Sequence, residues 1–351
     1  MITKIMQEDL EFIIRQKLPW ELLDNSTILI AGANGYVPAY MLETLLYLND
    51  KCNKNIKVIA LVRNKEKALK RFCHHKNRKD LKFIVQDVSQ PIILEKNEKI
   101  NYIIHAASQA IPKYYDTDPI GTLSANTLGT INLLKLTNKE DFKGFLFFST
   151  GGVYGRVEDK NIPMNEDAYG YLDPTDVKSC YNESKRMGEN ICVGWFHQYG
   201  IPTKIVRISY VYGPGMDLND ERAFHSFVSD IVNNRDILME SSGNATRSFC
   251  YIADATLAFF TVLLKGGNGE AYNVGTEKET SIFELARTLI GLFPERGIKI
   301  IKKQDVNTFD VVKSSTRRSC FDISKIKSLG WKPVFDLREG SKRTILSFLE
   351  E

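Results

Sequence analysis

A repeated alternation of short apolar runs with polar or helix-like segments constrains this chain more than any other feature. The apolar runs lie at 27–35, 57–64, 81–88, 100–108, 144–150 and 203–214. Each is short and rich in Val, Ile or Phe, which is typical of strands that are covered on both faces. Such strands, joined by helical segments, assemble into a parallel sheet with helices on either side. The sequence therefore predicts an α/β fold built on a doubly wound parallel sheet.

The first apolar run ends in a glycine-containing turn and is followed by a helical stretch at 39–48. Gly32 and Gly35 allow a tight turn and close approach of a pyrophosphate, whose charge is stabilised at the helix N-terminus. The turn, with Asn34, Tyr36 and Val37, is predicted to bind the dinucleotide. A third glycine, usual in this motif, is replaced by Pro38, which the first turn of a helix accepts. We expect a Rossmann-type dinucleotide site here; a bare structural turn is the alternative.

The second run ends at Arg63, where an acid would normally bind the adenosine ribose diol. With Lys65 and Lys67 close by, Arg63 offers cations to a 2′-phosphate. The expected cofactor is NAD(P), with NADP favoured over NAD. The alternative is a solvated basic start of a helix.

The third and fourth runs end in further candidate cofactor contacts. Asp87 and Val88 are placed to contact adenine, and small residues follow the fourth run where a cofactor would press on the backbone, in the stretch His105, Ala106 and Ala107. Taken singly, each could equally be ordinary loop structure. We retain them because they follow successive strands of one predicted sheet.

Tyr181 and Lys185 form the strongest chemical signal. Residues four apart share a face of a helix, so the hydroxyl and the ammonium can converge on one substrate. A cation beside a phenol favours the phenolate, and we expect Lys185 to lower the pKa of Tyr181 and make it a general base. The pair follows about thirty residues after the stretch at 149–155, which closes the fifth run.

The texture of the chain changes after Pro214, where helical pieces at 222–234 and 282–293 mix with isolated strand-like pieces at 249–255 and 270–275. We expect an N-terminal helical extension at 1–25, a dinucleotide-binding domain at 26–213 and a smaller mixed α/β substrate-binding lobe at 214–351. Segments at about 250–275 are expected to return to the first domain. Ligands of open α/β sheets bind at the carboxyl edge, so the site should lie between the two parts.

Composition narrows the function classes. The net charge is only +4 over 351 residues, and bases and acids are interspersed. The sequence therefore has no basic cluster that would indicate binding to nucleic acid or to an anionic membrane. The charged N-terminal stretch is predicted to be a short amphipathic helix rather than a signal peptide or membrane span. Six scattered cysteines without a CxxC pair indicate a cytoplasmic protein with reduced thiols. His74 and His75 complete no metal spacing with them, so no metal site is expected.

The motifs together identify a family resemblance. The sequence contains GANGYVP, HAAS, STGGVYG, YNESK, VYGP, TRSFCYIAD and YNVG in that order. This order resembles the extended short-chain dehydrogenase/reductases that act on nucleotide sugars, over about residues 27–337. The likeness is greatest to the branch of UDP-glucuronate decarboxylase and dTDP-glucose 4,6-dehydratase.

The resemblance implies roles for particular residues. Thr150 would hydrogen-bond the reacting hydroxyl, Tyr181 would take its proton, and Lys185 would hold the cofactor ribose while Asn126 helps to place that lysine. The substrate diphosphate would be bound by arginines, whose planar fork matches phosphate oxygens. The candidates are Arg247, Arg222 and Arg317. A surface ion pair is the alternative for Arg222 and Arg317.

Three departures bear on the reaction. Where the related dehydratases and decarboxylases carry acid–base side chains, this chain has Gly151 and Gly152, and Tyr210 stands where an asparagine is usual. We therefore expect a nucleotide-sugar 4-epimerase acting through a 4-keto intermediate. A UDP-glucuronate-type decarboxylase ranks second and a net C4 dehydrogenase third, with a 4,6-dehydratase disfavoured. A catalytically idle dinucleotide-binding sensor or platform is the alternative of another class. The resemblance also implies a homodimer and surface polysaccharide biosynthesis.

Overall fold

A seven-stranded parallel sheet forms the centre of the computed structural model, which describes residues 2–96, 98–302 and 318–350. The strand order is β11-β6-β5-β4-β1-β2-β3. In chain order the strands are β1 (Thr27–Ala31), β2 (Lys57–Val62), β3 (Leu81–Val85), β4 (Tyr102–His105), β5 (Gly144–Thr150), β6 (Thr203–Ile208) and β11 (Glu270–Val274). The chain reverses its direction across the sheet between β1 and β4, which makes the carboxyl ends of these strands the expected ligand edge. The predicted fold class is confirmed.

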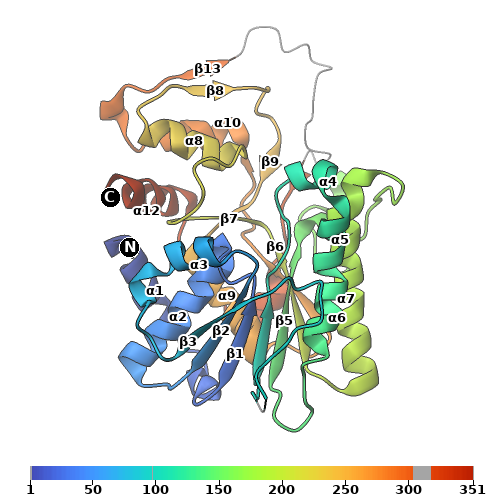
Figure 1. Cartoon of the computed structure of the whole chain (residues 1–351). Coiled ribbons are helices and arrows are strands. Elements are labelled where there is room, and N and C mark those ends of the chain that lie inside the picture. The colour runs from blue at the N-terminus through green and yellow to red at the C-terminus, as the bar shows by residue number, and fades with distance from the viewer. Residues whose placement is uncertain (1, 97, 303–317, 351) are drawn as a thin grey trace.

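Helices cover both faces of this sheet (Figure 1). One face carries α2 and α9 with α1 beside them, and the other carries α5, α6 and α7. The α-helices are α1 (Lys4–Ile14), α2 (Tyr36–Cys52), α3 (Lys65–Arg71), α4 (Lys113–Thr117), α5 (Pro119–Asn126), α6 (Leu128–Leu134), α7 (Cys180–Tyr199), α8 (Ala223–Val232), α9 (Ile252–Lys265), α10 (Ile282–Ile290), α11 (Ser324–Ser328) and α12 (Leu337–Leu349). Short 3₁₀ turns are η1 (Trp20–Leu23), η2 (Cys73–His75), η3 (Gly151–Tyr154), η4 (Asp159–Asn161), η5 (Val177–Ser179) and η6 (Pro294–Arg296).

A smaller lobe lies over the carboxyl end of the sheet, where α8, α10 and short strands gather (Figure 1). Its strand pairs are β7 (Tyr210–Tyr212) with β10 (Phe249–Tyr251), and β8 (Ile237–Met239) with β13 (Ile300–Lys302). A third small sheet orders β12 (Thr280–Ser281), β9 (Thr246–Arg247) and β14 (Arg318–Ser319). Ser281 and Glu284 form a reciprocal capping box that starts α10.

The apolar run at 203–214 was expected to be one strand, and the structure divides it. Residues up to Ile208 pair with β5 and β11, whereas Tyr210–Tyr212 pairs with β10 in a separate sheet. Ser209 sits at the break, where its N–H donates to the carbonyl of Val274 at 2.9 Å. The division carries the chain from the central sheet into the smaller lobe.

The N-terminal helix α1 lies on the chain itself. Ile5, Leu10 and Ile13 are buried, as their spacing predicted, and α1 packs against α2, α9 and α12. None of the helices in the described ranges is both long and apolar enough to cross a lipid bilayer.

Candidate active site

The turn after β1 has the geometry that a dinucleotide phosphate site needs. Gly32 has φ +78°, and a Cβ added there would lie 2.7 Å from the Cα of Ala107. Both the left-handed backbone and the close approach therefore require glycine. The N–H of Gly35 donates to the carbonyl of Gly32 at 2.8 Å, and Gly35 is the N-cap of α2. The first N–H groups of α2, at Tyr36 and Val37, consequently face a position suited to a phosphate.

Pro38 occupies the first turn of α2 and is buried. It contacts the turn directly, because a Cβ at Gly35 would lie 3.1 Å from the proline Cγ. Proline costs nothing at this position, where the N–H has no helical acceptor. The departure from the three-glycine pattern is therefore compatible with the same turn.

The ends of β2 and β3 bring a base and an acid together. A guanidinium nitrogen of Arg63 lies 3.9 Å from a carboxylate oxygen of Asp87, and both side chains are exposed. Asp87 also accepts hydrogen bonds from the N–H and hydroxyl of Ser89, at 2.9 and 2.8 Å. Val88 is buried, and its carbonyl accepts a hydrogen bond from Asn132. The groups predicted for the adenosine end thus lie at neighbouring strand ends.

The stretch that follows β4 serves packing as well as the site. The His105 ring is buried and contacts Phe145 and Phe147 edge-on. Burial lowers its pKa to about 3, so it is neutral. Its side chain belongs to the core beneath the sheet edge. The backbone at Ala106 and Ala107 is what closes against Gly32.

Thr150 and Tyr181 meet above the end of β5. Thr150 ends that strand and caps the turn η3 by accepting from the N–H of Gly152 at 3.2 Å. Tyr181 stands in the first turn of α7, and its hydroxyl hydrogen-bonds Thr150. The strand end and the helix start therefore place a hydroxyl pair at the carboxyl edge of the sheet.

Lys185 stands one turn further along α7 and is 2% exposed. Its Nζ donates to the carbonyl of Phe148 at 2.5 Å and lies 5.9 Å from the centre of the Tyr181 ring. Burial lowers the pKa of Lys185 to about 7, while the charge of Glu189 acts in the opposite direction. The predicted convergence of Tyr181 and Lys185 on one helix face is present.

The expected lowering of the Tyr181 pKa by Lys185 is not observed. Burial raises the pKa of Tyr181, and the influences that lower it are the hydrogen bond with Thr150 and the charge of Arg222. The lysine ammonium is instead directed at a main-chain carbonyl. Desolvation of the phenol therefore outweighs the positive charge of Arg222.

Asn126, at the end of α5, is completely buried beside this helix. Its amide donates to the hydroxyl of Ser184 at 2.9 Å, next to Lys185 in sequence. Its side-chain oxygen Oδ1 has no hydrogen-bond partner among the described residues. This buried acceptor fits the predicted role of placing the lysine through a further donor.

Two contacts at the site were missed at the sequence level. Tyr115, from α4, stacks on the Tyr181 ring with centroids 5.2 Å apart and planes inclined by 12°. The second feature is the packing at Gly151 and Gly152, where side chains of other residues occupy the space beside each glycine. A Cβ at Gly152 would lie 2.0 Å from the Asn182 amide oxygen, and one at Gly151 would lie 2.5 Å from the Phe321 ring. Only the tyrosine-rich stretch at 113–117 could have hinted at the first, and no local pattern predicts the second.

The predicted substrate residues gather on the lobe side. Arg247, buried on β9, donates from Nε to the hydroxyl of Tyr210 at 3.2 Å and from Nη1 to the carbonyl of Thr246 at 2.6 Å. Arg222 makes a two-pronged pair with Asp220 and keeps 44% of its side chain exposed. Its charge reaches Tyr181, Tyr115 and Tyr210. Arg317 lies outside the described residues.

Known proteins share both the sequence and the architecture. Residues 28–275 match the family described as "NAD dependent epimerase/dehydratase family". The chain is 32% identical over 321 residues to UDP-glucuronic acid decarboxylase 3 of Arabidopsis thaliana, covering 90% of this chain and 87% of that relative. Among solved structures, UDP-glucose 4-epimerase of Thermotoga maritima, with UDP-glucose, has a TM-score of 0.78 at 22% identity, covering 92% of this chain and 99% of its own. A UDP-glucuronic acid 4-epimerase of Bacillus cereus, in complex with UDP-glucuronic acid and NAD, has a TM-score of 0.74 at 21% identity, with the same coverage.

Proposed function

The chain belongs to the NAD dependent epimerase/dehydratase family, as its motifs predicted, and we propose that it is a nucleotide-sugar 4-epimerase. An enzyme of this family uses a nicotinamide dinucleotide on a nucleotide-linked sugar. The proposal concerns the reaction: C4 of the sugar is oxidised to a ketone and then reduced from the other face.

The observation that carries this proposal is the filled space at the two glycines. Neither Gly151 nor Gly152 offers an ionisable group, and Phe321 and Asn182 occupy the volume that side chains there would need. Elimination of water across C5 and C6 needs a base and an acid close to those carbons. Epimerisation at C4 needs neither, because proton transfer at the C4 oxygen suffices. The residues proposed for C4 chemistry are thus present, and the described residues at 151 and 152 supply no acid–base pair for C5 and C6.

In this mechanism Thr150 hydrogen-bonds the C4 hydroxyl and Tyr181 accepts its proton as the hydride leaves C4. When bound, NAD(P)⁺ supplies the hydride acceptor and the positive charge of its oxidised ring. Burial raises the pKa of Tyr181, so its base form depends on additional positive charge in the site. Lys185 would hold the ribose hydroxyls of the cofactor, and Tyr181 would return the proton to the C4 oxygen when the ketone is reduced on its other face.

NADP is the proposed cofactor. The support is Arg63, which directly follows β2 and is exposed close to Lys65 and Lys67. The Asp87 carboxylate lies 3.9 Å from the Arg63 guanidinium, so the arginine partly neutralises it. Binding titrations should give tighter binding of NADPH than of NADH, and the preference should fall in Arg63→Ala.

A decarboxylase of the UDP-glucuronate type is the second candidate, and the 32% identical Arabidopsis relative favours it. A sugar with a C4 ketone and a C5 carboxylate is a β-keto acid, which can lose carbon dioxide without the acid–base pair. Arg222, whose side chain is partly exposed and whose charge reaches Tyr181, is a candidate cation for such a carboxylate, although it is paired with Asp220.

Proton NMR in deuterium oxide separates these reactions. The purified protein would be incubated with NAD(P) and UDP-glucuronate, UDP-xylose, UDP-glucose, UDP-GlcNAc, dTDP-glucose and GDP-mannose in turn. Inversion at C4 without deuterium in the sugar supports the epimerase. Deuterium at C5 with loss of carbon dioxide identifies the decarboxylase, and deuterium at C5 with loss of water overturns the proposal.

A homodimer is also part of this proposal. Ile120 on α5 and Met187 on α7 are large apolar side chains exposed to 69% and 52% on the outer helical layer (Figure 1). Covering such side chains is favourable. Light scattering of the purified chain should give twice the mass of 40.0 kDa.

A further inference from the structure

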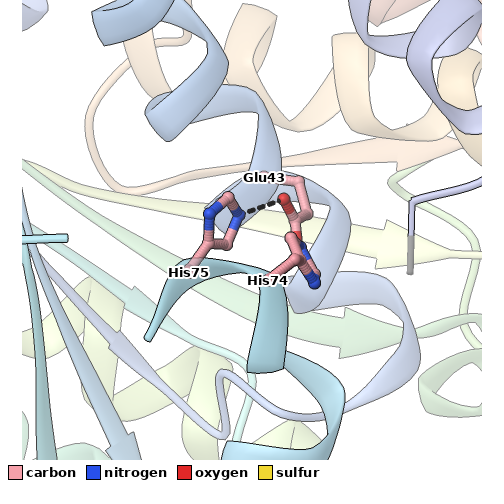
Figure 2. A group of neighbouring side chains, drawn as sticks. All are labelled: Glu43, His74 and His75. Carbon is pink, nitrogen blue, oxygen red and sulfur yellow. Dashed lines mark hydrogen bonds and ion pairs between the residues drawn. The ribbon is translucent and has the colours of Figure 1, made fainter. Parts of the chain in front are cut away.

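Three metal-binding side chains converge away from the active site, on the outer side of the sheet. Glu43 lies in the middle of α2, and the adjacent residues His74 and His75 form the turn η2 that follows α3. Figure 2 shows both imidazoles directed at the one carboxylate. The Nε2 of His74 lies 2.9 Å from one carboxylate oxygen, and the Nε2 of His75 lies 2.7 Å from the other. One ligand atom from each of the three residues can be chosen within 4.8 Å of the others.

The two histidines gather around a carboxylate that is buried. Glu43 is 3% exposed, yet its pKa lies below the usual value: burial raises it, and the hydrogen bonds and charges of the two histidines more than compensate. The two imidazole rings are 4.1 Å apart between centroids, so they present their nitrogens close together on the same carboxylate. A carboxylate and two imidazoles form a donor set that Zn²⁺ accepts.

We propose that Glu43, His74 and His75 bind one Zn²⁺ ion per chain. The three donors would occupy three tetrahedral positions, and water would take the fourth. Water can approach on the side of His74, whose side chain is 20% exposed. Zinc bonds of roughly 2.0–2.1 Å set tetrahedral donors about 3.4 Å apart, so the present contacts must open by about half an ångström. Rotation of the histidine side chains on their short turn can supply that movement.

Arg71 is a further charged group whose field reaches Glu43. Its guanidinium extends toward the carbonyl of Gly215, 3.4 Å away, and does not take a ligand position. A bound ion would join α2, which begins at the dinucleotide turn, to the segment that leads from α3 into β3. Its effect would therefore be to stabilise the part of the fold that carries the adenosine end of the cofactor site.

The test is Zn²⁺ titration of the chelator-treated, full-length protein by calorimetry, with Co²⁺ as a spectroscopic substitute. We expect one Zn²⁺ per chain, an intense visible Co²⁺ spectrum of tetrahedral type, and a melting temperature that rises with Zn²⁺. His74→Asn and His75→Asn should lose all three responses. Matched controls are His197→Asn, which removes a histidine on α7, and Cys73→Ser, which removes the exposed thiol beside the cluster. Both controls should keep the wild-type stoichiometry and affinity.

Absence of Zn²⁺ binding in the wild type would overturn the proposal and leave the cluster as a hydrogen-bonded brace between α2 and η2. Binding that persists in both histidine variants, or that disappears in Cys73→Ser, would overturn it as well. X-ray absorption of the wild-type zinc complex does not depend on whether the variants fold. It should give two imidazole ligands with oxygen in the remaining positions; any sulfur ligand contradicts the proposed site.

Discussion

At the scale of single residues, the proposed chemistry depends on one hydroxyl, that of Tyr181. It hydrogen-bonds Thr150, and the Tyr181 ring is partly buried and stacks on the ring of Tyr115. Tyr181→Phe should lower kcat by about 10²–10⁴-fold, the range typical of a lost general acid–base, while cofactor binding is retained. Steady-state turnover and a dinucleotide titration check the two parts.

Tyr115→Phe is the matched control. It removes the hydroxyl of the neighbouring tyrosine, which donates to the carbonyl of Ala110, and keeps the ring that stacks on Tyr181. Turnover close to the wild type is expected. An equal loss in both variants would mean that packing of the aromatic pair, rather than proton transfer at Tyr181, limits the rate.

The residues of the site were predictable from the sequence, but several of their contacts were not. Tyr181 and Lys185 were predictable because helical spacing alone puts them on one face. The contacts that decide their chemistry were not, because they come from distant segments: Tyr115 from α4, and Phe321 from the segment that follows β14. The raised pKa of Tyr181 was missed for a related reason, since burial by folded neighbours cannot be read from residue types in one helix.

At the scale of elements, the turn from β1 into α2 is the most tightly constrained. Gly32→Ala would place its Cβ 2.7 Å from a backbone atom of Ala107 with φ at +78°. The left-handed conformation alone costs roughly 1–2 kcal/mol for alanine, and the contact adds to it. We expect a destabilised protein with weakened dinucleotide binding, measured by urea unfolding and by titration with NADPH.

Gly194→Ala is the corresponding control in a helix. Gly194 lies inside α7, and a Cβ there meets no atom within 4 Å. Alanine should stabilise the protein by up to about 1 kcal/mol, because glycine is a poor helix former, and leave cofactor binding unchanged. A similar loss of binding in the two variants would show that the turn has no special requirement for Gly32.

The elements themselves were largely predictable. Six of the seven central strands coincide with apolar runs, and the seventh, β11, lies in a stretch that reads as strand-like. The division of the sixth run at Ser209 was not predictable, because it depends on a hydrogen bond to Val274 from a strand more than sixty residues later. The Glu43 cluster was missed likewise, since His74 and His75 find their partner on a different helix.

At the scale of the whole molecule, a buried network ties the two ends of the chain to its centre. Asp9 on α1 accepts hydrogen bonds from Tyr40 on α2 and Tyr251 on β10, at 3.2 and 2.7 Å, and from Arg343 on α12 at 2.8 Å. Burial raises the pKa of Asp9 to about 6, against the opposing effects of Arg343 and the hydroxyls. The folded chain therefore holds this proton more tightly than the unfolded chain does.

The sign of the pH dependence follows. The stability contributed by Asp9 is fully present below its unfolded pKa of 3.8 and is lost as the pH rises through about 6. Asp9→Asn removes this dependence. As the pH rises from 3.8 to about 6, the free energy of unfolding of the variant minus that of the wild type should increase by up to about 3 kcal/mol. Urea unfolding over a pH series measures the difference, and parallel curves for the two proteins would refute the prediction.

The central claim, that hydride leaves C4 and returns to C4, is tested most directly by a deuterium label at C4 of the nucleotide sugar. After incubation with unlabelled NAD(P)⁺ and the enzyme, NMR locates the label in the products. A 4-epimerase keeps deuterium at C4 in both epimers. Deuterium found at C6 after loss of water, or left on the reduced dinucleotide with a 4-keto sugar as product, would contradict the claim.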